Sequence, residues 1–314
     1  MNENLDLFEK VINKTIPKVD YEDIRGGNGN NTSIIMKDGE VQEINTGNSL
    51  GIRIRVLNNG AWGFAYTNDL SKLDEIAQTS IKISNSLKGD ESLSKADIIQ
   101  DKVSTDVKIP FSDVSIEEKK EIMSEASKAA SLKEVTSTTV SYSDSQSQEV
   151  ILSSEGTSIE MNTNRVAMFL NAAASDGTMM QIGHNSIGGV KGFEAISDED
   201  IEAFGRKIGE KAVRLLKAES APSGRFPIIA DPNLTGVFVH EALGHAVEGD
   251  LILQNDSILK DKLGSKIGSE IVNIYDDASL KDGFGYYPYD VEGVKTKPNQ
   301  LVKDGKLISL LNSR

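Results

Sequence analysis

Apolar residues recur every three to four positions in four stretches of this chain, a spacing that places them on one face of an α-helix. The stretches predict helices over about residues 5–13, 70–87, 116–130 and 198–217. Ser115 and Glu118 form a capping box that predicts the start of the third helix, and Ser197 with Asp200 predicts the start of the fourth. Each helix therefore has an apolar face that needs a partner surface.

Elsewhere apolar and polar residues alternate, which is typical of strands with one buried face. This pattern predicts an antiparallel meander in the middle of the chain and further strands in its C-terminal part. The predicted strands are 138–142, 149–152, 157–162, 165–174, 225–230 and 270–275. We interpret the serine-rich segment 141–147 as the end of a strand followed by a turn.

Glycine, asparagine and aspartate mark the predicted turns. Asp-Gly pairs predict hairpins at 38–39 and 304–305. The glycine-rich run 26–31 has the composition of a phosphate-binding loop, but it lacks the third glycine of a dinucleotide fingerprint, has no lysine and precedes a strand. We therefore interpret it as a hairpin turn. The polar stretch 87–110 is predicted to be an irregular linker.

The order of these elements indicates an α+β fold. An N-terminal domain of helices and strands is expected over residues 1–220, in sub-blocks of about 1–87 and 111–218. A junction at 221–224 leads to a β-rich C-terminal domain over 225–314, which is expected to be truncated and to carry a helix with two histidines.

The chain has 314 residues, no cysteine and a formal net charge of −14. Its length leaves room for two domains with a sizeable core. Without cysteines the chain can form no disulfide bonds, so nothing indicates an oxidising compartment. The acidic balance argues against nucleic-acid binding and mildly disfavours acidic substrates. No apolar run approaches the ~20 residues of a membrane span, and residues 1–8 lack a secretory signal pattern. We expect a cytoplasmic protein without membrane contact.

The most informative segment is 239–250, VHEALGHAVEGD. It contains two of the three histidines, His240 and His245, and Glu241 follows the first directly. Neutral imidazoles are common zinc ligands, and an adjacent carboxylate can act as general base toward a metal-activated water. This is the chemistry of a metallopeptidase, with His240 and His245 as zinc ligands and Glu241 as the catalytic base.

The spacing of this motif is one residue longer than that of the usual zinc-peptidase helix. On an ideal α-helix, residues five apart lie about 140° apart around the axis, so His240 and His245 would not face one metal ion. A local π-bulge, with about 4.4 residues per turn, brings them together. The motif therefore predicts a bulge between the two histidines, which Gly244 would ease.

Two histidines on one helix could instead be ordinary half-buried residues, each bonded to a backbone carbonyl. The context favours a site, because Asp231 and Pro232 predict a helix start directly after the strand at 225–230. An apolar stripe that His240 interrupts predicts that His240 points inward, and Gly249 is expected to end the helix. The stripe consists of Val237, Leu243 and Val247.

With its downstream Glu248 and Asp250, the motif resembles the zinc motif of the TldD/PmbA family of metallopeptidases. The resemblance extends over nearly all of the chain in the family's order. Its further blocks are 51–55, 60–67, 181–183, 188–189, 275–277 and 290–293. The family has a catalytic branch that keeps both histidines and a sister branch that has lost them. This chain resembles the catalytic branch.

One departure concerns the third zinc ligand. The catalytic branch completes its site with a cysteine near the C-terminus, and this chain has no cysteine. The chain is expected to be a fragment without the last part of its C-terminal domain, or a natural variant that recruits another ligand. Glu248, Asp250 and His184 are candidates, since zinc accepts carboxylates and imidazoles, and the sequence does not choose among them.

The resemblance implies a zinc-dependent peptidase that hydrolyses peptides or unfolded polypeptide segments, held extended in an enclosed cleft. It also implies a dimer, either a homodimer or a heterodimer with a sister family subunit. The alternative is a non-catalytic peptide-binding or scaffold subunit of a dimeric peptidase assembly.

Other polar and aromatic residues are given structural roles. Trp62 is expected to contribute packing, and His184 to be a loop histidine near the surface. Asp276 and Asp277, like the acidic residues in 290–292, are expected to form turns and caps, because they lack the ligand ladder of a calcium loop.

Overall fold

The computed structural model describes residues 2–281 and 283–314, which divide into two units. Unit 1 contains the chain up to Leu93, Asp97–Glu219 and residues 283–284. Unit 2 contains Ser94–Ala96, Ser220–Lys281 and Gly285–Arg314. Both units combine helices with strands, so the predicted α+β class is confirmed.

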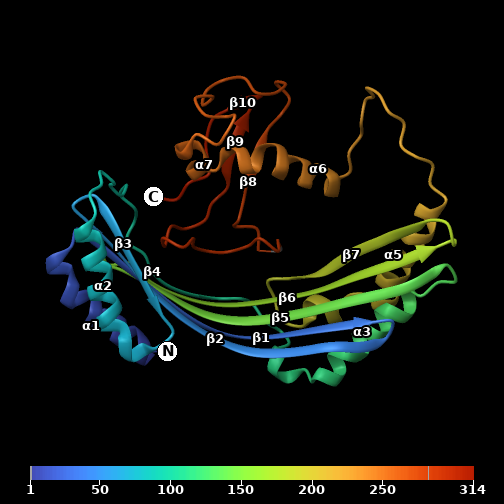
Figure 1. Ribbon diagram of the computed structural model, residues 1–314, viewed down its shortest axis with the longest axis horizontal. Helices are drawn as coiled ribbons and strands as arrows, with labels where there is room; N and C mark the ends of the chain where they lie inside the picture. The colour runs from blue at the N-terminus through green and yellow to red at the C-terminus, as the bar shows by residue number, and fades with distance from the viewer. Residues whose placement is uncertain (1, 282) are drawn as a thin grey trace. The chain divides into compact units, whose positions relative to one another are not determined.

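One seven-stranded sheet forms the frame of unit 1, in the order β3-β2-β1-β5-β6-β4, with β7 also pairing with β6 (Figure 1). The strands are β1 (Tyr21–Lys37), β2 (Glu40–Asn58), β3 (Ala61–Thr67), β4 (Gln100–Ser104), β5 (Val135–Ser153), β6 (Ser158–Ser175) and β7 (Met180–Gly189). Neighbours are antiparallel except β4 and β6. β1, β2, β5 and β6 have 17 to 19 residues each, well beyond the usual strand length. Both predicted N-terminal sub-blocks contribute strands to this sheet.

The glycine-rich run 26–31 lies in the middle of β1, so the predicted hairpin turn is wrong. Its residues pair with β2 on one side and with β5 on the other. Ladder hydrogen bonds from both neighbours hold the glycines in extended conformation, an influence that local composition does not reveal. The serine-rich segment 141–147 is likewise strand interior rather than a turn, and β5 runs through it without a break.

Two predicted hairpin turns are confirmed. Asp38 and Gly39 join β1 to β2 with φ angles of 53° and 82°. Asp304 and Gly305, with φ angles of 48° and 75°, join β9 (Asn299–Lys303) to β10 (Lys306–Leu307) in unit 2. Positive φ at both central residues belongs to the type I′ turn that matches strand twist, which is why Asp-Gly is such a good indicator.

The four predicted helices are present as α1 (Asn2–Thr15), α2 (Leu73–Ser86), α3 (Ile116–Ala130) and α5 (Ile201–Leu216). Shorter turns are η1 (Ile16–Lys18), η2 (Leu70–Lys72), η3 (Phe111–Asp113) and α4 (Glu194–Ser197). The capping box of Ser115 and Glu118 is confirmed. Asp200 alone caps α5, because its carboxylate accepts from the Ala203 N–H at 2.9 Å, whereas Ser197 belongs to α4.

Both helix pairs cover the same face of the sheet (Figure 1). Side chains alternate between faces along a strand, and the buried strand residues under both pairs are even-numbered. Under α1 and α2 they are Ile24, Ile52, Ile54, Val56, Val150 and Leu152. Under α3 and α5 they are Ile34, Met36, Val140, Tyr142, Val166, Met168, Leu170, Ala172 and Ala174. The glycine-rich part of β1 lies between these two cores, and no described helix of unit 1 covers the odd-numbered face.

The predicted linker 87–110 is only partly irregular. It contains β4, which pairs with β6 in parallel, Gln100 opposite Ser158 and Ser104 opposite Asn162. Polar residues dominate β4 because it lies at the edge of the sheet, where little of it is buried. The alternation of a half-buried strand is therefore missing from its sequence.

Unit 2 contains α6 (Pro232–Val239), η4 (His240–Gly244), η5 (His245–Val247) and α7 (Gly249–Gln254), and a sheet of β8 (Ile274–Asp276), β9 and β10. Its small core consists of Leu243, Val247, Leu301, Val302 and Leu307. The strand predicted at 270–275 begins later, at Ile274. The strand predicted at 225–230 is wrong, because none of the three described strands pairs with this segment. Ile228 is 80% exposed there.

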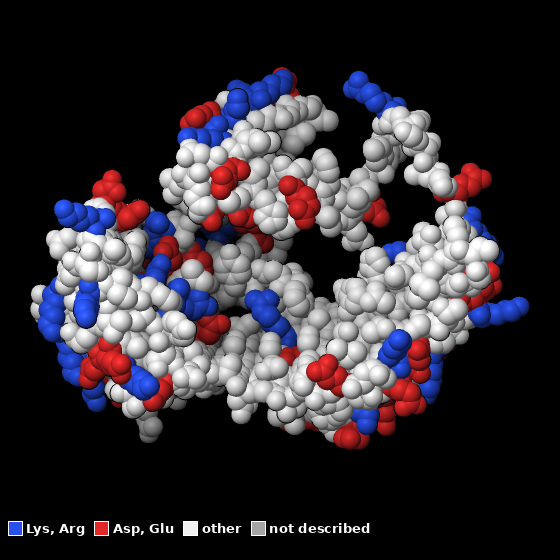
Figure 2. Space-filling view, viewed as in Figure 1, with Lys and Arg blue, Asp and Glu red and all other residues white. Residues whose placement is uncertain are grey.

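None of the described helices is both long and apolar enough to cross a lipid bilayer. Acidic and basic side chains are interspersed over the surface of both units in the view of Figure 2.

Candidate metal centre

The helix that carries the histidines begins as predicted. The Asp231 carboxylate accepts a hydrogen bond from the Leu234 N–H at 2.8 Å, and Pro232 occupies the first helical position. This arrangement satisfies one of the free N–H groups of the first turn, and proline removes another. Asp231 and Pro232 therefore determine where α6 starts, and the start determines the direction in which each following side chain points from the helix.

After Val239 the backbone widens into the π-helical turn η4, which spans His240–Gly244. The predicted bulge between the two histidines is thus confirmed. The His245 N–H bonds to the His240 carbonyl, the i→i+5 hydrogen bond of a π-helix. Gly244 has ordinary helical angles, and a Cβ there would lie 3.7 Å from His240 Nδ1, so the turn does not require glycine.

The π turn brings three polar side chains together. Donor atoms of His240, Glu241 and His245 lie within 4.8 Å of one another. The two imidazole ring centroids are 4.5 Å apart, with 70° between the ring planes. Two imidazoles at this separation suit zinc, and a carboxylate beside them could accept a proton from a metal-bound water, so the residues present fit the metal that the sequence implied.

Glu248 contacts the second histidine. Its Oε1 lies 2.7 Å from His245 Nδ1, and the two side chains are 39% and 50% exposed. A carboxylate on one ring nitrogen fixes the tautomer of the imidazole and leaves the other nitrogen, Nε2, as the one that can bind a metal. Glu248 is one of the three candidates for the third ligand, and in the structure its carboxylate contacts the His245 ring.

The helix does not end at Gly249. Glu248 leaves helical conformation with φ −64° and ψ 127°, and Gly249 then opens α7. The Gly249 N–H donates to the Leu311 carbonyl at 2.8 Å, and this contact replaces a continuing helical hydrogen bond. A Cβ at Gly249 would lie 3.1 Å from that same oxygen, so close backbone approach explains the glycine.

The expectation that His240 points inward is wrong. His240, Glu241 and His245 are all exposed, and Val237 of the predicted apolar stripe is 60% exposed. Only Leu243 and Val247 of that stripe are buried, against Leu301, Val302 and Leu307. The widened turn changes which side chains face the core, because the helix no longer has 3.6 residues per turn beyond Val239.

The other two candidates for a third ligand lie outside this group. Asp250 is an exposed residue of α7. His184 belongs to β7 of unit 1 and stacks on Phe169 at 6.2 Å between ring centroids, so it is an exposed strand residue and not the predicted loop histidine. Among the described residues, the group that could hold a metal ion remains His240, Glu241 and His245.

Of the remaining structural interpretations, that of Asp276 is wrong, because Asp276 is the last residue of β8 and pairs with Asn299, and the others agree with the structure. Trp62 packs edge-on against Tyr21 with ring centroids 6.1 Å apart. Asp277 accepts from the Ser279 N–H at 2.9 Å, and Asp290 accepts from the Glu292 N–H at 2.8 Å, so both carboxylates form turns.

Three family models match the chain in sequence order. They describe PmbA/TldA metallopeptidase domain 1 over residues 23–84, the central domain over 109–216 and the C-terminal domain over 223–314. The chain belongs to the PmbA/TldD family of metallopeptidases. This confirms the family proposed from the motif and the blocks around it.

Relatives from archaea are similar along most or all of the chain. A metalloprotease of Methanothermobacter thermautotrophicus is 53% identical over 100% of this chain and 69% of its own length. A metalloprotease of Methanocaldococcus jannaschii is 40% identical over 99% of this chain and 69% of its own length. A zinc metalloprotease TldD homolog of Saccharolobus solfataricus is 28% identical over 84% of this chain and 58% of its own length.

Solved structures share the fold. A candidate modulator of DNA gyrase from Bacteroides thetaiotaomicron has a TM-score of 0.84 at 20% identity, covering 99% of this chain and 72% of its own. TldE from Thermococcus kodakarensis has a TM-score of 0.71 at 19% identity, covering 97% of this chain and 69% of its own.

Proposed function

We propose that this chain is a zinc-dependent peptidase, with His240 and His245 as metal ligands and Glu241 as the general base. The observation that carries the proposal is the π turn, which brings donor atoms of all three residues within 4.8 Å of one another. A regular helix would separate the histidines, and π turns are rare and often occur at functional sites. The names of the metalloprotease relatives support the same chemistry.

Each residue of the group has a separate task. The imidazoles of His240 and His245 bind the metal through neutral nitrogen, and Glu248 orients His245 by accepting its second ring proton. Glu241 takes a proton from the attacking water and passes it to the leaving amine. Bound zinc supplies a water acidic enough to lose that proton near neutral pH, and it polarises the scissile carbonyl. The third protein ligand stays open between Glu248, Asp250, His184 and a group outside this chain.

We further propose that the substrates are peptides or unfolded polypeptide segments, bound extended in an enclosed cleft. The protein is expected to act as a dimer, with itself or with a sister family subunit. A non-catalytic peptide-binding or scaffold subunit is the alternative, because the chain has two imidazoles at the site but no cysteine. Neither form is expected to act on nucleic acids or at a membrane.

Two variants test the assignment. The purified chain is expected to bind about one zinc ion, by elemental analysis, and His240→Ala to bind none. Glu241→Gln should keep its zinc and hydrolyse an unstructured fluorogenic peptide at least about 100-fold more slowly. Glu270→Gln, an exposed carboxylate of the same unit, serves as the matched control. Equal zinc in the parent and His240→Ala would contradict the ligand assignment, and full activity of Glu241→Gln would remove it from the mechanism.

A further inference from the structure

β2 is only partly covered at the outer edge of the seven-stranded sheet (Figure 1). β3 pairs with it from Ile52 to Asn58, and no described strand pairs with the same edge over residues 40–51, which form the open edge of β2. An open edge is a template for pairing with another chain, and proteins usually protect it with charges or prolines. Over residues 43–51 this edge carries one charged side chain, Glu43, and no proline.

The backbone groups of the open edge are directed outward at every second residue. Asn59 and Gly60, with φ angles of 50° and 73°, form the two-residue turn between β2 and β3. The residues that flank such a turn bond to each other, so even-numbered residues of β2 direct their N–H and C=O groups toward the side of β3. Odd-numbered residues bond to β1, with a regular register from residue 43 onward. The residues of the open edge whose backbone groups therefore point outward include Ile44, Thr46, Asn48 and Leu50.

Two apolar side chains are exposed along this edge. Ile44 is 43% exposed and Leu50 is 38% exposed, and both lie on the even-numbered face of the sheet. Gly47 lies midway between them in the sequence. An antiparallel pair of β2 strands centred on Gly47 would place Ile44 opposite Leu50 of the second copy, and Leu50 opposite Ile44. A two-fold axis at Gly47 would thus form the same apolar contact twice.

The same register suits the polar positions. Thr46 would lie opposite Asn48 of the second copy and Asn45 opposite its Ser49, so polar side chains meet polar ones. Because even-numbered residues oppose even-numbered ones, the outward backbone groups of the two strands meet each other. A shift by one residue would break these hydrogen bonds, and a centre at Thr46 would place Ile44 opposite Asn48.

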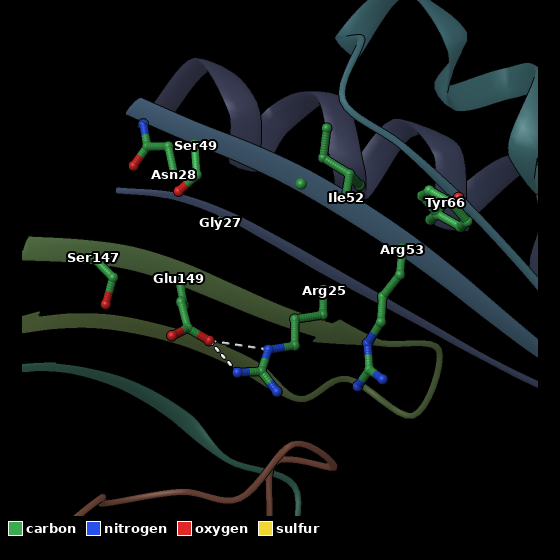
Figure 3. Close-up of a pocket in the computed structure, with 10 residues that line it drawn as sticks. Arg25, Gly27, Asn28, Ser49, Ile52, Arg53, Tyr66, Ser147 and Glu149 are labelled. Carbon is green, nitrogen blue, oxygen red and sulfur yellow. Dashed lines mark hydrogen bonds and ion pairs between the residues drawn. The ribbon is translucent and has the colours of Figure 1, made fainter. Parts of the chain in front are cut away.

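Charge and space fit this register as well. Glu43 would lie opposite Gly51 of the second copy, so no like charges oppose each other. Gly51 lines a pocket of about 470 Å³, and a Cβ there would meet no atom within 4 Å, which leaves room for the glutamate side chain (Figure 3). Gly47 brings no side chain to the axis. A centre at Asn48 would collide with β3, which already occupies the edge at Ile52.

We propose that two copies of this chain join through the open edge of β2, as an antiparallel pair over residues 43–51 centred on Gly47. The two sheets then continue into one another across the two-fold axis. The occupant is a second copy because the edge is complementary to itself, apolar against apolar and acidic against neutral. This inference rests on the dimer in the proposed function and assigns the surface that forms it, and it depends on neither metal nor hydrolysis.

The chain has no cysteine, so engineered thiols test the register directly. Asn45→Cys and Ser49→Cys are made as separate full-length variants, each at an exposed position. In the proposed pair, residue 45 lies opposite residue 49 of the second copy, at a Cα separation of about 5 Å that a disulfide can span. A mixture of the two variants under mild oxidation should form disulfide dimers on a non-reducing gel. Each variant alone should stay uncross-linked, because its two cysteines lie about 14 Å apart.

A second variant tests the interface without cross-linking. Ile44→Lys should raise the dissociation constant of the dimer at least about tenfold, measured by sedimentation, because a charge replaces the apolar contact on both sides of the axis. Ile44 is already exposed in the single chain, so circular dichroism is expected to show an unchanged fold. Ile83→Lys, at an exposed isoleucine of α2, is the matched control and should dimerise like the parent.

Three results would overturn the proposal, and they are distinguishable. A mixture that cross-links no better than the single variants would contradict the register. A dimer as tight in Ile44→Lys as in the parent would assign the contact to another surface and leave the proposed dimer intact. A monomeric parent chain would contradict the homodimer as well and would leave the edge to a different polypeptide. The zinc assignment is measured separately and is unaffected by all three.

Discussion

At the scale of single residues, Glu248 shows how a side chain can act through its neighbour. It contacts His245 Nδ1 at 2.7 Å while both remain partly exposed. Glu248→Gln is expected to lower zinc affinity about 10- to 100-fold, because the imidazole loses its orienting carboxylate. Competition with a chromophoric chelator measures this change, with Glu270→Gln as control. A loss of all zinc binding would instead identify Glu248 as a direct ligand.

Glu22 is a second residue with a measurable effect, here on stability. It is fully buried under α1, its carboxylate accepts from the Thr15 hydroxyl, and burial raises its pKa from 4.5 to about 7. The folded state therefore holds a proton that the unfolded state releases above pH 4.5. The stabilisation is fully present below that pH and is lost as pH rises through about 7.

The resulting prediction is that the unfolding free energy of unit 1 depends on pH. Unit 1 should lose up to about 3 kcal/mol of unfolding free energy between pH 4.5 and pH 8, because Glu22 must ionise in an apolar environment. Glu22→Gln should remove this dependence and keep the Thr15 contact. Urea titrations at several pH values measure it. An identical pH profile in Glu22→Gln would assign the effect to other groups.

At the scale of elements, α3 is attached to β5 by a buried ion pair. Lys119 Nζ lies 2.7 Å from Asp144 Oδ2, with side chains 3% and 6% exposed, and the Tyr142 hydroxyl donates to the same oxygen at 2.6 Å. Asp144→Ala should cost about 3–5 kcal/mol, since it leaves a buried ammonium group unpaired. The double variant Lys119→Met with Asp144→Leu should recover most of that loss. Chemical denaturation of both proteins compares them directly, and a double variant as unstable as the single one would contradict this account.

Elements with a local signature were predictable from the sequence. The capping box at Ser115, the proline after Asp231 and the Asp-Gly turn at 38–39 each satisfy backbone groups within a few residues, so composition reveals them. The interior of β1 was not predictable in this way. The run 26–31 is a strand only because β2 and β5 flank it, and those partners lie far away in sequence.

The candidate site was partly predictable, because part of it depends on a local sequence signature. The spacing of His240 and His245 predicted the π turn, which is a local property. The exposure of His240 and the carbonyl contact of Gly249 depend on Leu311 and on the other residues that form the unit 2 core. A pocket on the sheet of unit 1, lined by Gly51 and Arg53 among others, was not predicted, because its residues come from four strands and form no motif in sequence.

At the scale of the whole molecule, the two units have separate cores, and the candidate ligands belong to one of them. A ligand stabilises only the structure that contains its site. Zinc at 100 times its dissociation constant should stabilise unit 2 by about 2.7 kcal/mol and leave the unfolding of unit 1 unchanged. Calorimetry with zinc and with a chelator resolves the two transitions. Equal shifts in both would show that the units unfold together.

The long strands of unit 1 have one further consequence. β1 and β5 run without interruption from the core beneath α1 and α2 to the core beneath α3 and α5. A chain that melts in one core must release strands whose other halves are still packed in the second. The glycine-rich centre of the sheet therefore couples the unfolding of the two cores through its backbone hydrogen bonds. A substitution that destabilises one core should also lower the stability of the other.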